Sequence, residues 1–347
     1  MIERFFPRYE IVRQMLLGSN SRQIIHTQNS IGQAYLLYIP APNFSKHGSL
    51  QHNEQGYRGA AVPLNRAPGK LRILFLGGST TYGLKVPNPD ETYPAQIGRI
   101  LEQMPEGKNG VEIINGGLTW GTTAEITTHF LFKYRYYQPD IVVLNTGAND
   151  AQGSIRPFYH PDYSHWRHTL PKVWPLPAMA RWITHSRFVA LFSIRVFYSE
   201  VARDSHFVHK YTAPPARWYT NVHRDAADTL RIPEEDLAFK NNLRTIIREV
   251  KAEGAELLLV PFRAKPDNKF GDRLLAETAR NETILRQLAT EFGIDLAPFP
   301  SDVISSQNWA DSMCHLNAAG SQEKARHVMA YLLPIVRRMV AKGVARK

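Results

Sequence analysis

Ser79 is the residue of this sequence best placed to act as a nucleophile. It follows an apolar run at residues 71–76 and the pair Gly77 and Gly78, so the pattern predicts a short buried strand that ends just before the serine. In open α/β sheets, ligands bind at the carboxyl ends of the strands. An ordinary turn or a helix cap would use the same residues, so a catalytic role for Ser79 requires partners.

His315 is the candidate base. A serine hydroxyl is a weak nucleophile until a base takes its proton, and the base is usually a histidine oriented by a carboxylate. His315 lies in a late loop, four residues after Asp311. Gly117 and Asn149 follow two other predicted strands, where a backbone N–H and a side-chain amide would stabilise the oxyanion formed by attack on an ester.

Four blocks of this sequence resemble those of the SGNH (GDSL-like) hydrolases, a family named after its Ser, Gly, Asn and His. The first block reads Gly-Gly-Ser-Thr instead of Gly-Asp-Ser-Leu, a variant that the family tolerates. A segment at residues 53–59 (Asn-Glu-Gln-Gly-Tyr-Arg-Gly) is similar to a lead-in found in some branches of the family. The four blocks follow the family order and span most of the chain: residues 77–83, 115–121, 147–150 and 311–320.

The resemblance implies a three-layer α/β/α sandwich around a central, mainly parallel five-stranded sheet, which is the flavodoxin-like fold of the family. It also implies that Ser79 is the nucleophile and that His315 acts as general base and then general acid. The Ser79 N–H, a glycine N–H and the Asn149 side chain would form the oxyanion hole. Gly117 is the favoured glycine, with Gly121 as the substitute. No cofactor or metal is implied.

One position departs from the family pattern. The family aspartate precedes the histidine by three residues, where this chain has Ser312, whereas Asp311 precedes His315 by four. A one-residue bulge would bring the Asp311 carboxylate to the imidazole, because loops absorb insertions readily. The alternative is a Ser-His dyad in which a backbone carbonyl orients the imidazole.

The rest of the chain alternates predicted strands and helices, which is typical of a parallel sheet built from βαβ units. Short apolar runs predict strands, and apolar residues at helical spacing predict helices between them. Pro334 is expected to kink the last helix. The predicted strands lie at residues 71–76, 111–115, 140–147, 255–262 and 293–296, and the helices at 92–104, 122–136, 237–251, 274–292 and 318–339.

Two regions fall outside this alternation. Residues 1–70 are predicted to form an N-terminal extension that wraps the core, with a short helix at 5–17 followed by loop-like chain. Residues 151–233 are predicted to be an insertion that acts as a lid or substrate region, so residues 71–150 and 234–347 make up the hydrolase domain. The insertion carries aromatic residues suited to a lid core or a sugar platform, and histidines without metal-site spacing: Trp166, Trp174, Trp182, Trp218, His160, His165, His168, His206 and His209.

The composition gives weaker indications. The 42 Lys and Arg against 31 Asp and Glu give a net charge of +11, but the charge is dispersed and no nucleic-acid module accompanies it. The single cysteine, Cys314, excludes an internal disulfide. No signal peptide or transmembrane run is evident, so a cytoplasmic location is the default expectation. The oligomeric state is not indicated.

The function predicted from the sequence is a serine-dependent esterase. The substrate would carry a small O-acyl group on a carbohydrate or similar small-molecule acceptor, and the reaction would pass through an acyl-enzyme on Ser79. An O-acyltransferase using the same site is the first alternative, because the acceptor of the acyl group decides the outcome. A non-catalytic binding protein on the same scaffold is the second.

Overall fold

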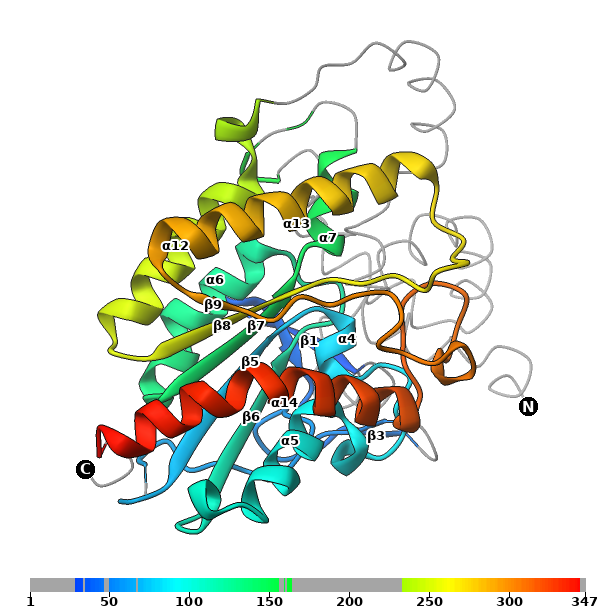
Figure 1. Ribbon diagram of the computed structural model, residues 1–347. Helices are drawn as coiled ribbons and strands as arrows, with labels where there is room; N and C mark the ends of the chain where they lie inside the picture. The colour runs from blue at the N-terminus through cyan, green and yellow to red at the C-terminus, as the bar shows by residue number, and fades with distance from the viewer. Residues whose placement is uncertain are drawn as a thin grey trace, which may run out of the picture.

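The centre of the protein is a five-stranded sheet in which neighbouring strands run parallel (Figure 1). The computed structural model describes residues 29–33, 35–46, 50–66, 68–155, 159, 161–163 and 233–343. In spatial order the strands are β6 (Val111–Gly117), β5 (Leu71–Gly77), β7 (Ile141–Thr146), β8 (Glu256–Pro261) and β9 (Asp295–Leu296). All five strands predicted from the sequence are therefore present, and the predicted fold class is confirmed.

The central strands are apolar on both faces because both faces are covered by helices. Every residue of β5 and β7 is buried, as expected for parallel strands inside a layered fold. Alternate side chains enter different cores, so Leu74 and Leu76 join one hydrophobic cluster while Ile73 and Phe75 join the other. The sheet thus separates two cores.

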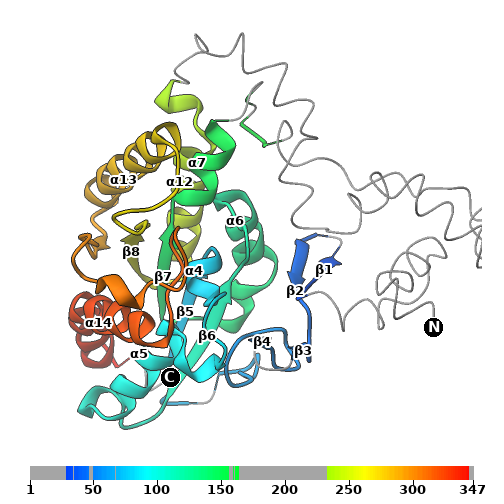
Figure 2. The ribbon, with the colours of Figure 1, turned by 90° about the vertical axis from the view of Figure 1, so that its right-hand side faces the viewer.

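In the described part of the chain, helices cover both faces of the sheet, as the view in Figure 2 shows. One face of the sheet packs against α6 (Thr123–Phe132), α12 (Ala238–Ala252) and α13 (Asp272–Phe292). The opposite face packs against α5 (Tyr93–Glu102) and α14 (Ala318–Ala341). This is the predicted three-layer arrangement. Helix α14 runs through Pro334 to its end at Ala341.

Several boundaries differ from those predicted. Strand β6 extends two residues beyond the predicted end because Gly116 and Gly117 continue to pair with β5. Two short helices begin where loops were expected, α4 (Ser79–Tyr82) and α7 (Ala148–Ser154). Each follows a glycine at the end of a strand, and Gly147 has a φ of 132°, which other residues rarely adopt.

The N-terminal part of the described chain is more ordered than predicted. Instead of loop-like chain, it contains two antiparallel ribbons, β1 (Ser30–Gln33) with β2 (Leu37–Pro40) and β3 (Ser45–Lys46) with β4 (Leu50–Gln51). The first ribbon is held to α6, because the ring nitrogen Nε2 of His129 lies 2.9 Å from the Tyr38 carbonyl oxygen. Pairing between separated short segments is not visible in local periodicity, which explains the error.

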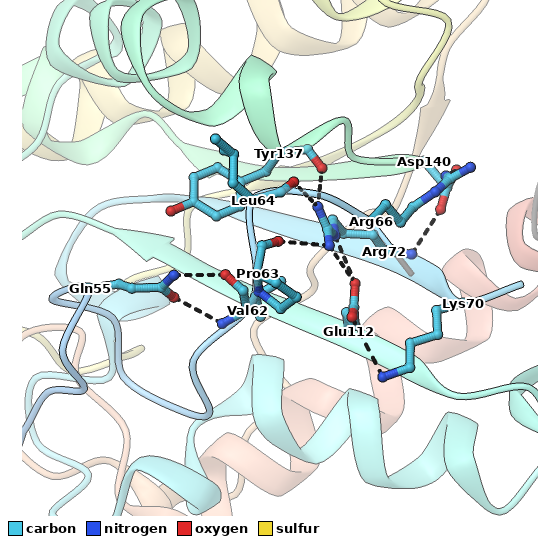
Figure 3. Close-up of polar contacts among 10 residues, drawn as sticks. All are labelled: Gln55, Val62, Pro63, Leu64, Arg66, Lys70, Arg72, Glu112, Tyr137 and Asp140. Atoms are coloured by element: carbon cyan, nitrogen blue, oxygen red, sulfur yellow. Dashed lines mark hydrogen bonds and ion pairs between the residues drawn. The ribbon is translucent and has the colours of Figure 1, made fainter. Parts of the chain in front are cut away.

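The end of this N-terminal segment is fastened to the amino ends of the strands (Figure 3). The buried Arg72 guanidinium donates to the carbonyl oxygens of Pro63 and Leu64 at 2.9 and 3.0 Å. It also pairs with Glu112 at 2.7 Å, and the backbone N–H of Arg72 donates to Asp140 at 2.8 Å. The segment therefore contributes partners to a buried charge at the sheet edge opposite the candidate site.

The predicted division into extension, hydrolase domain and insertion stays a prediction. Residues 151–154 continue helix α7, while most of the predicted insertion lies outside the described residues, including its tryptophans and His160, His165, His168, His206 and His209. The helix predicted at residues 5–17 also lies outside them. Among the described helices, none has the length and apolar character needed to cross a membrane.

Candidate active site

Helix α4 places Ser79 at the carboxyl edge of the sheet, directly after β5. The helix packs so closely on the strand ends that side chains on the adjoining glycines would collide with it. A Cβ on Gly77 would lie 2.3 Å from the Thr81 hydroxyl oxygen, and a Cβ on Gly117 would lie 2.2 Å from the Tyr82 backbone nitrogen. Glycine at both positions therefore lets the first turn of α4 sit on the sheet with Ser79 at its start.

Ser79, His315 and Asp311 form a continuous line of hydrogen bonds. Ser79 Oγ lies 2.9 Å from His315 Nε2, and His315 Nδ1 is hydrogen-bonded to Asp311 Oδ2. The two ring nitrogens thus face the serine and the carboxylate respectively. Of the two arrangements left open by the sequence, the structure contains the one with the carboxylate.

The four-residue spacing is accommodated by a loop that wraps around the Asp311 carboxylate. Asp311 Oδ1 accepts hydrogen bonds from the backbone N–H groups of Met313, Cys314 and His315 at 2.9, 3.0 and 3.2 Å. The loop is closed by the Ala310 N–H, which donates to the His315 carbonyl at 2.8 Å. One carboxylate oxygen therefore shapes the loop while the other holds the imidazole.

The same contacts keep the Asp311 carboxyl ionised. Partial burial opposes its charge, but the hydrogen bond and charge of His315 and the N–H groups of Met313 and His315 outweigh that effect. The pKa of Asp311 is therefore below its ordinary value. An ionised carboxylate favours the imidazole tautomer with a proton on Nδ1, which leaves Nε2 able to accept a proton from Ser79.

Asn149 lies beside Ser79, as its position in the sequence suggested. It belongs to the first turn of α7, and its Nδ2 donates to the Gly121 carbonyl oxygen at 2.8 Å. A Cβ on Gly78 would lie only 2.8 Å from the same Nδ2. The amide is therefore fixed at the start of α4.

The N–H of Gly117, the favoured oxyanion-hole donor, already has a partner in this structure. The Gly117 N–H donates to Asn115 Oδ1 at 3.1 Å, and Gly117 is packed beneath α4 instead of lining the cleft. The substitute, Gly121, lines the cleft, but its N–H donates to the Leu118 carbonyl at 3.0 Å. Each N–H is thus bonded within the fold, and the choice between the two glycines as oxyanion-hole donor stays a prediction.

Asp150 braces the turn next to Asn149. It is fully buried and accepts hydrogen bonds from the Thr123 N–H, the Thr123 hydroxyl and the Tyr163 hydroxyl. Burial raises the pKa of Asp150 to about 6, although the bonds from Thr123 and Tyr163 oppose that change. The carboxylate ties α7 to the start of α6 and so fixes the place of Asn149.

A cleft of about 370 Å³ opens at Ser79. Trp120, which the sequence interpretation did not single out, lies in its wall with a φ of 63°. The backbone of a tryptophan in this left-handed region is strained. Nothing in the sequence indicated this conformation or the position of Trp120 in the cleft wall, apart from its place between Thr119 and Gly121. The lining includes apolar and polar groups: Leu84, Lys85, Trp120, Asn149, Gln152, Phe262, Phe270, Met313 and His315.

Within the described part of the chain, no group of three or more His, Cys, Asp or Glu side chains is arranged to hold a metal ion.

Residues 75–323 match the model of the GDSL-like lipase/acylhydrolase family, which is more than half of the chain. The chain therefore belongs to this family of ester-hydrolysing enzymes. No curated protein matches it in sequence.

Three solved structures illustrate its structural neighbours. An acetylxylan esterase from Geobacillus stearothermophilus is 15% identical, with a TM-score of 0.43 over 76% of this chain and 94% of its own. LAE5, an α/β hydrolase from the Lake Arreo metagenome, is 14% identical, with a TM-score of 0.43 over 75% and 94%. A protein assigned to the G-D-S-L lipolytic family from Desulfitobacterium hafniense is 10% identical, with a TM-score of 0.43 over 75% and 99%.

Proposed function

We propose that this esterase removes a small O-acyl group from a carbohydrate or similar hydroxyl-bearing acceptor, through an acyl-enzyme on Ser79. The observation that carries the proposal is the line of hydrogen bonds from Ser79 through His315 to Asp311 at the wall of a cleft. A nucleophile, a base and an orienting carboxylate in mutual contact are the minimum requirement for acyl transfer through serine.

In the proposed reaction, Ser79 Oγ attacks the ester carbonyl while His315 Nε2 takes its proton. Asp311 holds the imidazole and stabilises the imidazolium that forms. His315 then gives the proton to the leaving alcohol oxygen as the carbon–oxygen bond breaks. A water molecule attacks the resulting acyl-Ser79 ester, again with His315 as base, and releases the free acid.

The oxyanion would be stabilised by the amide of Asn149 and the backbone N–H of Ser79. The Asn149 Nδ2 carries two protons, and its bond to the Gly121 carbonyl uses one of them. The second proton is the proposed donor to the oxyanion. Donors fixed before the reaction stabilise the developing charge without having to reorganise.

The cleft supports a preference for short acyl groups. Its volume of about 370 Å³ lies near the lower end of the range for small-molecule sites, roughly 300–1,000 Å³. Phe262 and Phe270 pack edge to face, with ring centroids 6.5 Å apart, and form part of the apolar wall. Hydrolysis of p-nitrophenyl esters should therefore be faster for acetyl than for octanoyl, and the reverse order would contradict this preference.

A fluorophosphonate probe tests the nucleophile directly. We expect the probe to label the wild type, and Ser79→Ala to abolish both labelling and ester hydrolysis. His315→Ala should lower turnover by several orders of magnitude with an unchanged circular dichroism spectrum. Equal labelling of Ser79→Ala, or no labelling of the folded wild type, would favour the non-catalytic alternative.

Product analysis separates hydrolysis from acyl transfer. With an acetyl ester donor and free sugars as acceptors, the proposal predicts acetate as the main product. If most of the acetyl group appears on the sugar, the enzyme is an O-acyltransferase that uses the same residues.

A further inference from the structure

Lys324 is a buried cation directly behind the candidate active site. It lies in the second turn of α14 and is 2% exposed. Its Nζ lies 4.2 Å from the centroid of the Tyr93 ring and 5.6 Å from that of Phe299. Among the described residues, no carboxylate lies within ion-pair distance of Nζ. Burying an ammonium group in this way removes its hydration without an opposite charge beside it, so a compensating role is expected.

The ammonium is joined to the residue after Ser79 through one amide. Lys324 Nζ donates to Asn145 Oδ1 at 2.7 Å, and the Thr80 hydroxyl donates to the same oxygen at 3.1 Å. Asn145 Nδ2 donates to the carbonyl oxygens of Val260 and Pro261, both at 3.0 Å. These donations fix the amide orientation, so its oxygen must face Thr80 and Lys324.

Only one layer of side chains separates Lys324 from the substrate cleft. Thr80, Asn145 and Cys314 line the cleft on one side and a small cavity of about 10 Å³ containing Lys324 on the other. Cys314 also directly precedes His315. A positive charge at this depth acts on the reacting groups through protein of low polarisability, where electrostatic interactions are strong.

Packing alone does not require a lysine at this position. A methionine of similar length would fill the same volume among Tyr93 and Phe299 without losing the hydration of a charge. The lysine therefore lowers the stability of the fold relative to a methionine, and buried ionisable groups with such a cost often serve a nearby reactive site.

We propose that Lys324 is a positioning residue for ester cleavage, whose ammonium fixes Asn145 and Thr80 behind Ser79 and supplies positive charge to the oxyanion formed there. This inference rests on the proposed function. Lys324 does not need to contact the substrate, because it acts through its hydrogen bond to Asn145 and through the electric field of its ammonium group. The negative charge that develops on the carbonyl oxygen is stabilised more in the transition state than in the substrate, so the effect belongs to kcat.

Burial gives the proposal a pH signature. It lowers the pKa of Lys324 to about 7, and Cys314 opposes that change. The other titratable or charged groups facing Nζ are Arg263 at the small cavity and the hydroxyl of Tyr93, which is bonded to Thr81. Below about pH 7 the ammonium is present, and above it the charge is progressively lost. The contribution of Lys324 to kcat should therefore decline as the pH rises from 7 to 9.

The lowered pKa of Lys324 also predicts how the stability of the fold depends on pH. The pKa of Lys324 in the folded protein is below that in the unfolded chain, so the unfolded chain binds more protons between about pH 7 and 10. The contribution of this group to stability consequently rises with pH in that window. Lys324→Met should remove this rise.

The test compares Lys324→Met and Lys324→Arg with the wild type in p-nitrophenyl acetate hydrolysis from pH 6 to 9. Lys342→Met, at the exposed end of the same helix, is the matched control. At pH 6.5 we expect Lys324→Met to lower kcat at least tenfold with KM within threefold of wild type, and with an equal or higher thermal midpoint. Lys324→Arg should retain more activity than Lys324→Met, and Lys342→Met should retain all of it.

Two results would overturn the proposal. A ratio of wild-type kcat to Lys324→Met kcat that stays constant between pH 7 and 9 would show that the charge of Lys324 does not assist the reaction. A folded Lys324→Met with wild-type kcat and pH profile, but altered stability, would show a structural role only. A wild-type enzyme that neither cleaves esters nor reacts with the fluorophosphonate would overturn the proposed function itself. Failure of the Lys324 proposal alone would leave both of these activities in place.

Discussion

At the scale of single residues, the two carboxylate oxygens of Asp311 make different contacts. Oδ2 bonds to His315, while Oδ1 accepts three backbone N–H groups of the loop that carries the histidine. A carboxylate four residues before the histidine can therefore replace one at the usual spacing of three residues, because the loop folds around the Asp311 side chain. The longer spacing alters the conformation of the loop but keeps the hydrogen bond between Asp311 and His315.

Asp311→Asn should lower kcat by two or more orders of magnitude with a small change in KM. The amide cannot stabilise an imidazolium and favours the wrong tautomer of His315. Steady-state hydrolysis of p-nitrophenyl acetate measures the effect, with the exposed Asp302→Asn as control. An Asp311→Asn enzyme with wild-type kcat would remove Asp311 from the mechanism.

Asp311 should also make stability depend on pH. Its pKa is lower in the folded protein than in the unfolded chain, so its contribution is present above its unfolded pKa and is lost as the pH falls through the folded value. The thermal midpoint of wild type, measured relative to Asp311→Asn, should therefore decrease on going from about pH 5 to pH 3. A difference that is constant over this range would contradict the prediction.

Trp120 offers a test of backbone strain at the cleft. Its φ of 63° costs a residue with a side chain about 1 kcal/mol or more, whereas glycine adopts it freely. Trp120→Gly and Trp120→Ala both remove the indole, so their difference isolates the backbone. Trp120→Gly should be the more stable of the two by about 1 kcal/mol in urea unfolding, and equal or reversed stabilities would show that the strain is absent.

At the scale of elements, the position of α4 on the sheet determines where Ser79 lies. The helix rests on Gly77 and Gly117, where its backbone and Thr81 occupy the space of a side chain. The importance of Gly117 is thus steric. The oxyanion-hole role assigned to Gly117 from the sequence stays a prediction, because a strand-end glycine can serve as a donor or as a contact surface, and the structure shows the contact surface.

Gly117→Ala should reduce stability and activity together. Its Cβ would lie 2.2 Å from the Tyr82 backbone nitrogen, so α4 must move and Ser79 moves with it. Overpacking of this kind costs about 1–3 kcal/mol. Gly271→Ala is the control, since a Cβ there meets nothing within 4 Å. Urea unfolding and kcat measure the two effects, and a stable, fully active Gly117→Ala would refute the steric role.

At the scale of the whole molecule, the described N-terminal segment is part of the hydrolase fold. Tyr57 and Val62 belong to the same buried cluster as Leu74 of the central sheet. The buried Arg58 guanidinium donates to the carbonyl oxygens of Val86 and Pro87, which follow α4. The segment therefore supports both the core and the chain that leads from the candidate site.

This packing predicts that residues 55–66 unfold together with the central sheet. Hydrogen–deuterium exchange should give the protected amides of this segment the same opening free energy as those of β5, because removing the segment would take the carbonyl oxygens of Pro63 and Leu64 from Arg72. Exchange of residues 55–66 well ahead of β5 would show that the segment is a separate, weaker unit.

Much of the fold could be predicted from the sequence because its signals are local. Continuous apolar strands ending in glycine, separated by helices of regular spacing, define the parallel sheet and its ligand-binding edge. The N-terminal ribbons were missed because their pairing partners are short and weakly patterned. The short helices α4 and α7 were missed because one or two turns leave too few residues for a period to be recognised.

The sequence by itself determined the family, the layered fold and the identity of Ser79, His315 and Asn149 as neighbours, since residue type and order along βαβ units suffice for these. Only the tertiary structure decided that Asp311 reaches His315, that Gly117 supports α4, and that Lys324 lies behind Ser79. Each of these depends on which atoms of distant segments face each other, at distances of a few ångströms that spacing along the chain does not specify.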